Sequence, residues 1–297
     1  VNNEIDLNDP NTKIQIVADM SLLNIAICYK NYEIVQLLLS NEKIDVNSNE
    51  IKYLSKNFML KYSPLIIAIK MQNIKFVQLL LSKDKIDINC KLIKTLNDEI
   101  NTEKTALYTA AETGNIDIIK SLLSFEKIDV NFLNTLKLCS RERRLKRTVL
   151  YKAVRANNKE LVQLLLENPN IDVNIKATDR TKNQELFSEK TPLYLAVKNT
   201  DTEMVKLLLS NPKIDVNEGL SKHMNYGIYR IKKSVLYEAI DRNCIEIIQL
   251  LFSNPNIDVN FKSLRVINKK NFAIKTTEKT ILYKAVEKQK PDIVKLL

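Results

Sequence analysis

The fold of this chain is decided by a stretch that begins with Thr191-Pro192-Leu193-Tyr194-Leu195-Ala196-Val197. The stretch continues with Met204-Val205-Lys206-Leu207-Leu208-Leu209 and ends with Ile214-Asp215-Val216-Asn217. The same order of residues recurs along the whole chain of 297 residues. Its alanine falls 42 to 46 residues apart, at Ala26, Ala68, Ala110, Ala153, Ala196, Ala239 and Ala285. A near-constant period predicts a repeat protein in which each unit packs on its neighbours.

Each unit divides into a block of 27 residues and a connector of 15 to 19 residues. We expect two short antiparallel helices in the block. Thr191 suits a helix N-cap, and Pro192 suits the first helical position, where its missing N–H costs nothing. Leu193, Ala196 and Val197 then lie three and four residues apart and form one apolar face.

The second helix is expected after a mid-block turn that an Asn or Asp marks, at Asn73, Asn115, Asn158 or Asp201. It is expected to end before an Asn-Pro pair such as Asn211-Pro212, because proline cannot continue a helix. The blocks cover residues 21–47, 63–89, 105–131, 148–174, 191–217, 234–260 and 280–297.

This pattern resembles the ankyrin repeat, whose signature T-P-L-H-x-A begins a helix–turn–helix unit of about 33 residues. The segment 191–196 matches the signature with Tyr194 in place of His, and the segments from Thr105 and Thr148 match more loosely. The connectors are longer than the fingers of the family. The resemblance implies an all-α repeat fold, an ankyrin-type solenoid of helix–turn–helix units with long β-hairpin or loop fingers.

The repeats also predict the domain organisation. We expect a single ankyrin solenoid over residues 1–297. Val1-Asn2 aligns with the tail of a preceding unit, and residues 294–297 align with the inside of a second helix. From this alignment we expect both ends to be cut within a longer array.

Positive charge is concentrated in the connectors. The net charge of the chain is +11. The six connectors hold 26 basic and 10 acidic residues, a net charge of +16, so the rest of the chain carries −5. Connectors 132–147 and 261–279 are the most basic, at +5 each. Such a surface favours an acidic partner.

We therefore place the candidate partner-binding residues on the fingers and on the first helices. Protein interfaces use Tyr and Arg as anchors, and the first helices of a solenoid line its concave face. The candidates are Lys137, Arg141, Arg143, Arg144, Lys146, Arg147, Tyr226, Tyr229, Arg230, Lys232, Lys233, Lys262, Arg265, Lys269 and Lys270 on the fingers, with Lys152 and Leu195 on first helices.

Several recurring residues have a structural interpretation. One Asp per unit, as at Asp215, is interpreted as a turn or cap device. The Tyr that replaces the signature His is expected to use its hydroxyl between neighbouring units. His223, the single histidine, has no Cys or His at ligand spacing, so we expect no metal and no cofactor. Without a nucleophile–base pair or a phosphate-binding loop, the chain is not expected to be an enzyme.

The leading functional hypothesis is a protein–protein interaction scaffold that binds an acidic partner along the basic fingers and the concave first-helix face. Two alternatives stay open: nucleic-acid or anionic-lipid binding through the same fingers, and a structural, self-assembling spacer array. The four cysteines have no framework spacing, which favours free thiols in a reducing cytoplasmic compartment, in this chain or a larger protein that contains it. No apolar run has the length of a membrane span.

Overall fold

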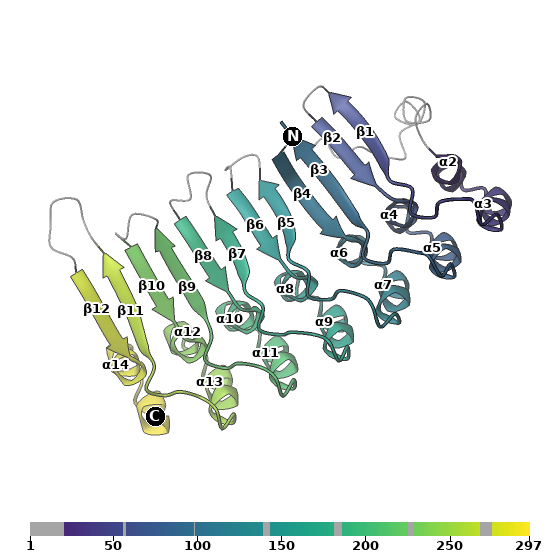
Figure 1. Cartoon of the computed structure of the whole chain (residues 1–297). Coiled ribbons are helices and arrows are strands. Elements are labelled where there is room, and N and C mark those ends of the chain that lie inside the picture. Colours follow the sequence, from purple (N-terminus) through teal and green to yellow (C-terminus); the bar gives the residue numbers. More distant parts are fainter. Residues whose placement is uncertain are drawn as a thin grey trace. The chain divides into compact units, whose positions relative to one another are not determined.

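The computed structural model describes residues 21–55, 58–97, 99–138, 143–180, 186–224, 229–267 and 275–297. The chain divides into two compact units, Val1–Asp129 and Val130–Leu297. Each is a stack of helix pairs with strands on the connectors (Figure 1). The single solenoid over residues 1–297 and its cut ends stay predictions.

The expected helix–turn–helix block is present in every repeat. The first helices are α2 (Leu22–Cys28), α4 (Pro64–Lys70), α6 (Ala106–Thr113), α8 (Val149–Arg155), α10 (Pro192–Lys198), α12 (Val235–Arg242) and α14 (Ile281–Glu287). The second helices are α3 (Tyr32–Leu39), α5 (Ile74–Leu81), α7 (Ile116–Leu123), α9 (Lys159–Leu166), α11 (Thr202–Leu209), α13 (Ile245–Phe252) and α15 (Pro291–Leu296).

Side-chain caps define where these helices begin. Thr191 Oγ1 accepts a hydrogen bond of 3.1 Å from the backbone N–H of Tyr194, which confirms the predicted N-cap. Asp201 Oδ1 accepts one of 3.0 Å from the N–H of Met204, so the mid-block residue is the N-cap of the second helix. The turn itself is made one residue earlier, where Thr200 has a φ of 57°.

Apolar faces of both helices form the core. In the repeat of α10 and α11, the predicted face of Leu193, Ala196 and Val197 is buried together with Val205 and Leu208. The first helices α8, α10, α12 and α14 contact one another in order. Burial of these faces between repeats is the main source of stability in a repeat protein.

The connectors form β-hairpins. In the first unit these are β1 (Glu50–Ser55) with β2 (Phe58–Tyr62), and β3 (Lys91–Leu96) with β4 (Glu99–Thr105). In the second unit they are β5 (Asn134–Leu138) with β6 (Arg143–Arg147), β7 (Ala177–Arg180) with β8 (Leu186–Lys190), β9 (Leu220–Met224) with β10 (Tyr229–Lys233), and β11 (Lys262–Ile267) with β12 (Lys275–Thr280).

Successive hairpins also pair with each other. β2 pairs with β3 in the first unit, and β6–β7, β8–β9 and β10–β11 pair in the second, all antiparallel. Two strands at about 4.8 Å each span about 9.6 Å, which matches the distance of 8–10 Å between packed helices. The fingers of each unit therefore form one continuous sheet.

An asparagine ladder joins the ends of successive blocks. Asn174 Nδ2 donates to the carbonyl of Lys213 at 2.7 Å, and its Oδ1 accepts from the N–H of Asp215 at 2.8 Å. The same pair of bonds recurs at Asn47, Asn89, Asn131 and Asn217. The repeated Asp fixes the turn that carries the next Asn of the ladder, since Asp215 Oδ1 accepts a hydrogen bond from the N–H of Asn217. This confirms the interpretation of that Asp as a turn device.

Candidate binding surface

The sheet of the second unit has an inner and an outer face. Side chains that are cross-strand partners lie on the same face, and neighbours along a strand alternate. On the inner face, Lys233 Nζ lies 3.2 Å from Glu238 Oε2 of α12, and Lys279 Nζ lies 2.5 Å from Glu287 Oε1 of α14. The opposite face points away from the first helices, and we call it the outer face.

A row of cationic and aromatic residues crosses six strands on the outer face. Arg144 pairs with Arg180, which pairs with Phe187, and the row continues through successive partners to Arg230. We call the six residues of this row the outer stripe: Lys137, Arg144, Arg180, Phe187, His223 and Arg230. They come from β5 to β10, one from each strand.

Contacts within the outer stripe fix its centre. The Arg180 guanidinium carbon lies 4.5 Å from the centroid of the Phe187 ring. The His223 ring lies on the other flank, with its centroid 4.7 Å from that of Phe187 and a tilt of 52°. A cation over an aromatic face is attractive, so these contacts hold Arg180 and His223 in place. Arg144, Arg180 and Arg230 are exposed.

The outer face as a whole is strongly basic. Among the strand residues that the structure describes, its carboxylates are Glu189 and Glu278. Its cations are Lys137, Arg144, Lys146, Arg180, Arg230, Lys232 and Lys262. An excess of one sign on a flat surface attracts partners of the opposite sign.

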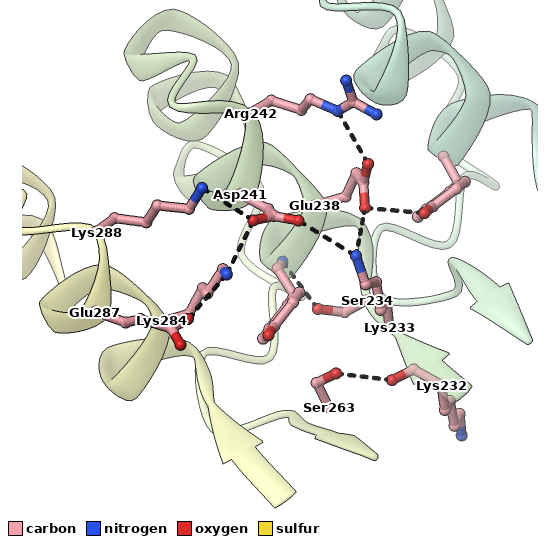
Figure 2. A network of polar contacts seen from close by, with 12 residues as sticks. Lys232, Lys233, Ser234, Glu238, Asp241, Arg242, Ser263, Lys284, Glu287 and Lys288 are labelled. Atoms are coloured by element: carbon pink, nitrogen blue, oxygen red, sulfur yellow. Dashed lines mark hydrogen bonds and ion pairs between the residues drawn. The ribbon is translucent and has the colours of Figure 1, made fainter. Parts of the chain in front are cut away.

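The inner face is different, because its Lys233 meets two carboxylates of the first helix α12 (Figure 2). Glu238 is 3 % exposed. It accepts from Tyr194 Oη at 2.9 Å, lies 3.2 Å from Lys233 Nζ and accepts from Arg242 Nε at 3.1 Å. The predicted use of the Tyr hydroxyl between neighbouring units is thereby confirmed at Tyr194.

We call Glu238, Asp241 and the side chains that bind them the inner network. Nearby positive charge and hydrogen bonds keep its two carboxylates ionised. Burial works to raise the pKa of Glu238, but the charge of Lys233 and the hydrogen bonds from its three donors outweigh burial and lower the pKa. Burial likewise opposes ionisation of Asp241, but the hydrogen bond from Lys284, the charge of Lys233 and the hydrogen bond from Lys288 lower its pKa to about 2. Lys233, which lies between Glu238 and Asp241, is therefore neutralised within the fold.

Comparison with known proteins agrees with the repeat architecture. The family model for ankyrin repeats, which spans three copies, matches residues 2–92, 90–177 and 177–263. The chain belongs to the ankyrin repeat family. Ankyrin repeats are in general protein–protein interaction modules, and they are binding domains without catalytic function.

Solved ankyrin structures share this fold. The ankyrin repeat domain of Bcl-3, described as a unique member of the IkappaB protein family, is 22% identical, with a TM-score of 0.58 over 93% of this chain and 98% of that one. The ankyrin repeat protein EF0377 is 19% identical, with a TM-score of 0.51 over 77% of this chain and 95% of that one. Among the curated proteins, no sequence matches this chain.

The sequence-predicted site residues of the ankyrin array fall into separate groups. Lys137, Arg144, Lys146, Arg230, Lys232 and Lys262 lie on the outer face. Arg147, Tyr229, Lys233 and Arg265 lie on the inner face. Arg143 is in β6, with a side chain outside the described part, and Arg141, Tyr226, Lys269 and Lys270 lie outside the described residues. The described candidates on the strands therefore lie on two opposite faces of the sheet and do not form one surface.

The first-helix row of the ankyrin array is not a continuous exposed surface. Lys152 and Leu195 are half-buried, but the equivalent residues Thr109 and Glu238 are buried at 2 % and 3 % exposure. Thr109 Oγ1 donates to the carbonyl of Thr105, and Glu238 holds the inner network. Sequence differences at Thr109 and Glu238 therefore reflect packing, and the candidates Lys152 and Leu195 stay predictions.

Sequence reasoning missed the centre of the outer stripe. Arg180, Phe187 and His223 come from three connectors, and none was among the candidates. The register between hairpins that brings them together is visible only in the structure.

Two further features of the described residues bear on function. No group of three or more His, Cys, Asp or Glu residues among them is arranged to hold a metal ion. Within the same ranges, no helix has the length and apolar character needed to cross a membrane.

Proposed function

We propose that this chain is a protein-interaction module that binds an acidic protein surface on the outer face of the sheet β5–β12. The observation that carries the proposal is the contrast between the two faces. The inner-face Lys233 lies between Glu238 and Asp241, whereas the described outer face holds an excess of cations over carboxylates, with Arg144, Arg180 and Arg230 exposed. Exposed, regularly placed charge gives a partner both steering and specificity.

A protein partner is favoured over nucleic acid by the state of the aromatic side chains. Single-stranded nucleic acids bind to exposed rings on which bases stack. Phe187 is half-buried and already contacts Arg180 and His223. Binding of nucleic acid or anionic lipid and end-to-end self-assembly thus stand as alternatives. The experiment below separates nucleic-acid binding and self-assembly from binding of a protein.

We place this function in a reducing, cytoplasmic compartment. Cys90 and Cys244 carry free thiols, and Cys139 lies outside the described residues. Cysteines that stay unpaired in a cysteine-containing chain are typical of such a compartment. The array would act there as a scaffold without a catalytic role.

The test is capture from a nuclease-treated lysate of the source cells with three versions of the chain. The outer variant carries Arg144→Gln, Arg180→Gln and Arg230→Gln. The control variant loses the same charge at the exposed Lys43, Lys75 and Lys120, away from the strands. We expect acidic proteins that the native chain and the control retain and that the outer variant loses.

The same comparison identifies the alternatives. Equal loss by both variants would show that only net charge matters and would contradict a defined surface. Recovery of nucleic acid without nuclease, with a steep fall of affinity as salt rises, would assign the surface to nucleic acid. Recovery of the chain's own copies alone would favour the self-assembling spacer.

A further inference from the structure

The outer stripe has a spacing that a partner must match. Its six residues lie on six adjacent strands of one unit. Adjacent strands are about 4.8 Å apart, so five intervals extend for about 24 Å across the strands. A bound segment that contacts the whole stripe must therefore run perpendicular to the strands and present one side chain about every 5 Å.

An α-helix meets this spacing better than an extended chain does. A helix presents one side chain of a given face per turn of about 5.4 Å, so five turns extend for about 27 Å. An extended segment presents alternate side chains about 6.6 Å apart, which extends to about 33 Å over five intervals. The helix departs from the stripe by about 3 Å at its end, a distance that flexible Lys and Arg side chains cover.

The order of side chains along the outer stripe determines which turns of a partner helix should be acidic and which apolar. Three cations, Lys137, Arg144 and Arg180, come first, then the ring of Phe187, and then His223 and Arg230. A matching helix carries acidic side chains at five turns and an apolar side chain at the fourth. The ring contacts of Arg180 and His223 with Phe187 hold the centre in place before binding, which lowers the entropy lost on association.

We propose that the outer stripe binds an acidic α-helix of a partner protein, laid across strands β5 to β10 with one side chain per turn over each strand. This inference rests on the proposed function and names the partner's structure. The inner face is not the docking site, because Lys233 and Lys279 are paired with Glu238 and Glu287 of the first helices.

The test uses three peptides of identical charge and the full chain. The first has Glu at i, i+4, i+7, i+14 and i+18 and Leu at i+11, one position per turn of about 3.6 residues, with Ala and Gln elsewhere. The second has the same composition with the Glu residues distributed around the helix. The third is the first with a central outward-facing residue replaced by Pro, which breaks the helix.

We expect the first peptide to bind about tenfold more tightly than the other two, and to gain helical circular dichroism on binding. The outer variant should weaken its binding by about tenfold, the effect of three exposed ion pairs. The Lys43, Lys75 and Lys120 control variant should bind it as the native chain does. Affinity is measured by fluorescence anisotropy at low salt.

Each other result overturns a defined part of the argument. Equal binding of all three peptides overturns the helix and leaves an acidic partner, and so the proposed function, in place. Failure of every peptide to bind also overturns the helix, and the capture experiment then decides the proposed function by itself. Tighter binding of an oligothymidine of equal charge overturns both and assigns the surface to nucleic acid.

Discussion

Glu238 shows how one side chain can connect neighbouring repeats. It lies on α12, and Tyr194 of the preceding repeat donates to it. Asp241, one turn further along α12, lies 2.9 Å from Lys284 of the following repeat. The network therefore couples three successive repeats through two carboxylates, and the equivalents of Glu238 in other repeats, such as Thr109, Lys152 and Leu195, are not carboxylates.

Replacing Glu238 with Ala is expected to lower the free energy of unfolding by about 3 kcal/mol, because Tyr194 Oη, Lys233 and Arg242 then lose their shared partner. Glu238→Gln should cost less, since the amide oxygen still accepts hydrogen bonds. Urea unfolding followed by circular dichroism measures both. Glu246→Ala on α13, an exposed carboxylate, is the control, with an expected change within about 0.5 kcal/mol.

The thiol of Cys90 is expected to be inert in the folded chain. Burial is the main cause that raises its pKa to about 12, although the hydrogen bond from Ser63 opposes the shift. Only the thiolate reacts with alkylating agents. At pH 8, iodoacetamide should therefore modify the half-buried Cys244 well before Cys90, as site-resolved mass spectrometry would record. Equal rates would mean that the repeat of Cys90 opens readily.

At the scale of single elements, local signals predict the helices well. These signals lie within a few residues of each other: Ser or Thr at the N-cap, Pro at the first helical position, and apolar residues three and four apart. The structure has α4 and α10 where these signals occur. Pairing between hairpins has no such local signal, because it depends on the distance between stacked helices. The outer stripe was missed for that reason.

Gly219 tests how closely the finger strands approach at their base. A Cβ at this position would lie 2.3 Å from the carbonyl oxygen of Lys233. We expect Gly219→Ala to push β9 from β10 and to cost about 1–3 kcal/mol. Gly114 is the control position, because a Cβ there would meet no atom within 4 Å. Its φ is 76°, so the substitution must be one that tolerates this conformation.

The equivalent turn positions of other repeats hold Asn157 and Asn243 at positive φ. Gly114→Asn is therefore expected to change the free energy of unfolding by less than about 0.5 kcal/mol. Thermal and urea unfolding of the two variants compare them directly. A tolerated Gly219→Ala would show that the base of the hairpin adjusts without loss.

At the scale of the whole molecule, the inner network makes stability depend on pH. The folded pKa of Asp241 is about 2 against an ordinary 3.8, so its stabilisation is complete above pH 3.8 and is lost as pH falls through about 2. Lys284 has a raised pKa because its hydrogen bonds to Asp241 and Glu287 outweigh burial. Its contribution is present below pH 10.5 and is lost as pH rises further.

We therefore expect the free energy of unfolding to fall between about pH 4 and pH 2, with about 1 kcal/mol due to Asp241 after allowance for solvent screening. Asp241→Asn should be less stable at pH 6 and should show a smaller acid loss. Urea titrations of the full chain at a series of pH values measure this. Identical acid profiles for the variant and the native chain would contradict a role for Asp241.

Pairing between hairpins also has a mechanical consequence. Antiparallel strand hydrogen bonds point across the strands, and in each unit that is the direction in which repeats follow one another. Tension applied along the stack therefore loads the β8–β9 and β10–β11 ladders directly, in parallel with the helix contacts. A stack of helix pairs without such a sheet extends gradually under tension. In each unit of this protein, the sheet is expected to resist extension until the hydrogen bonds between hairpins break.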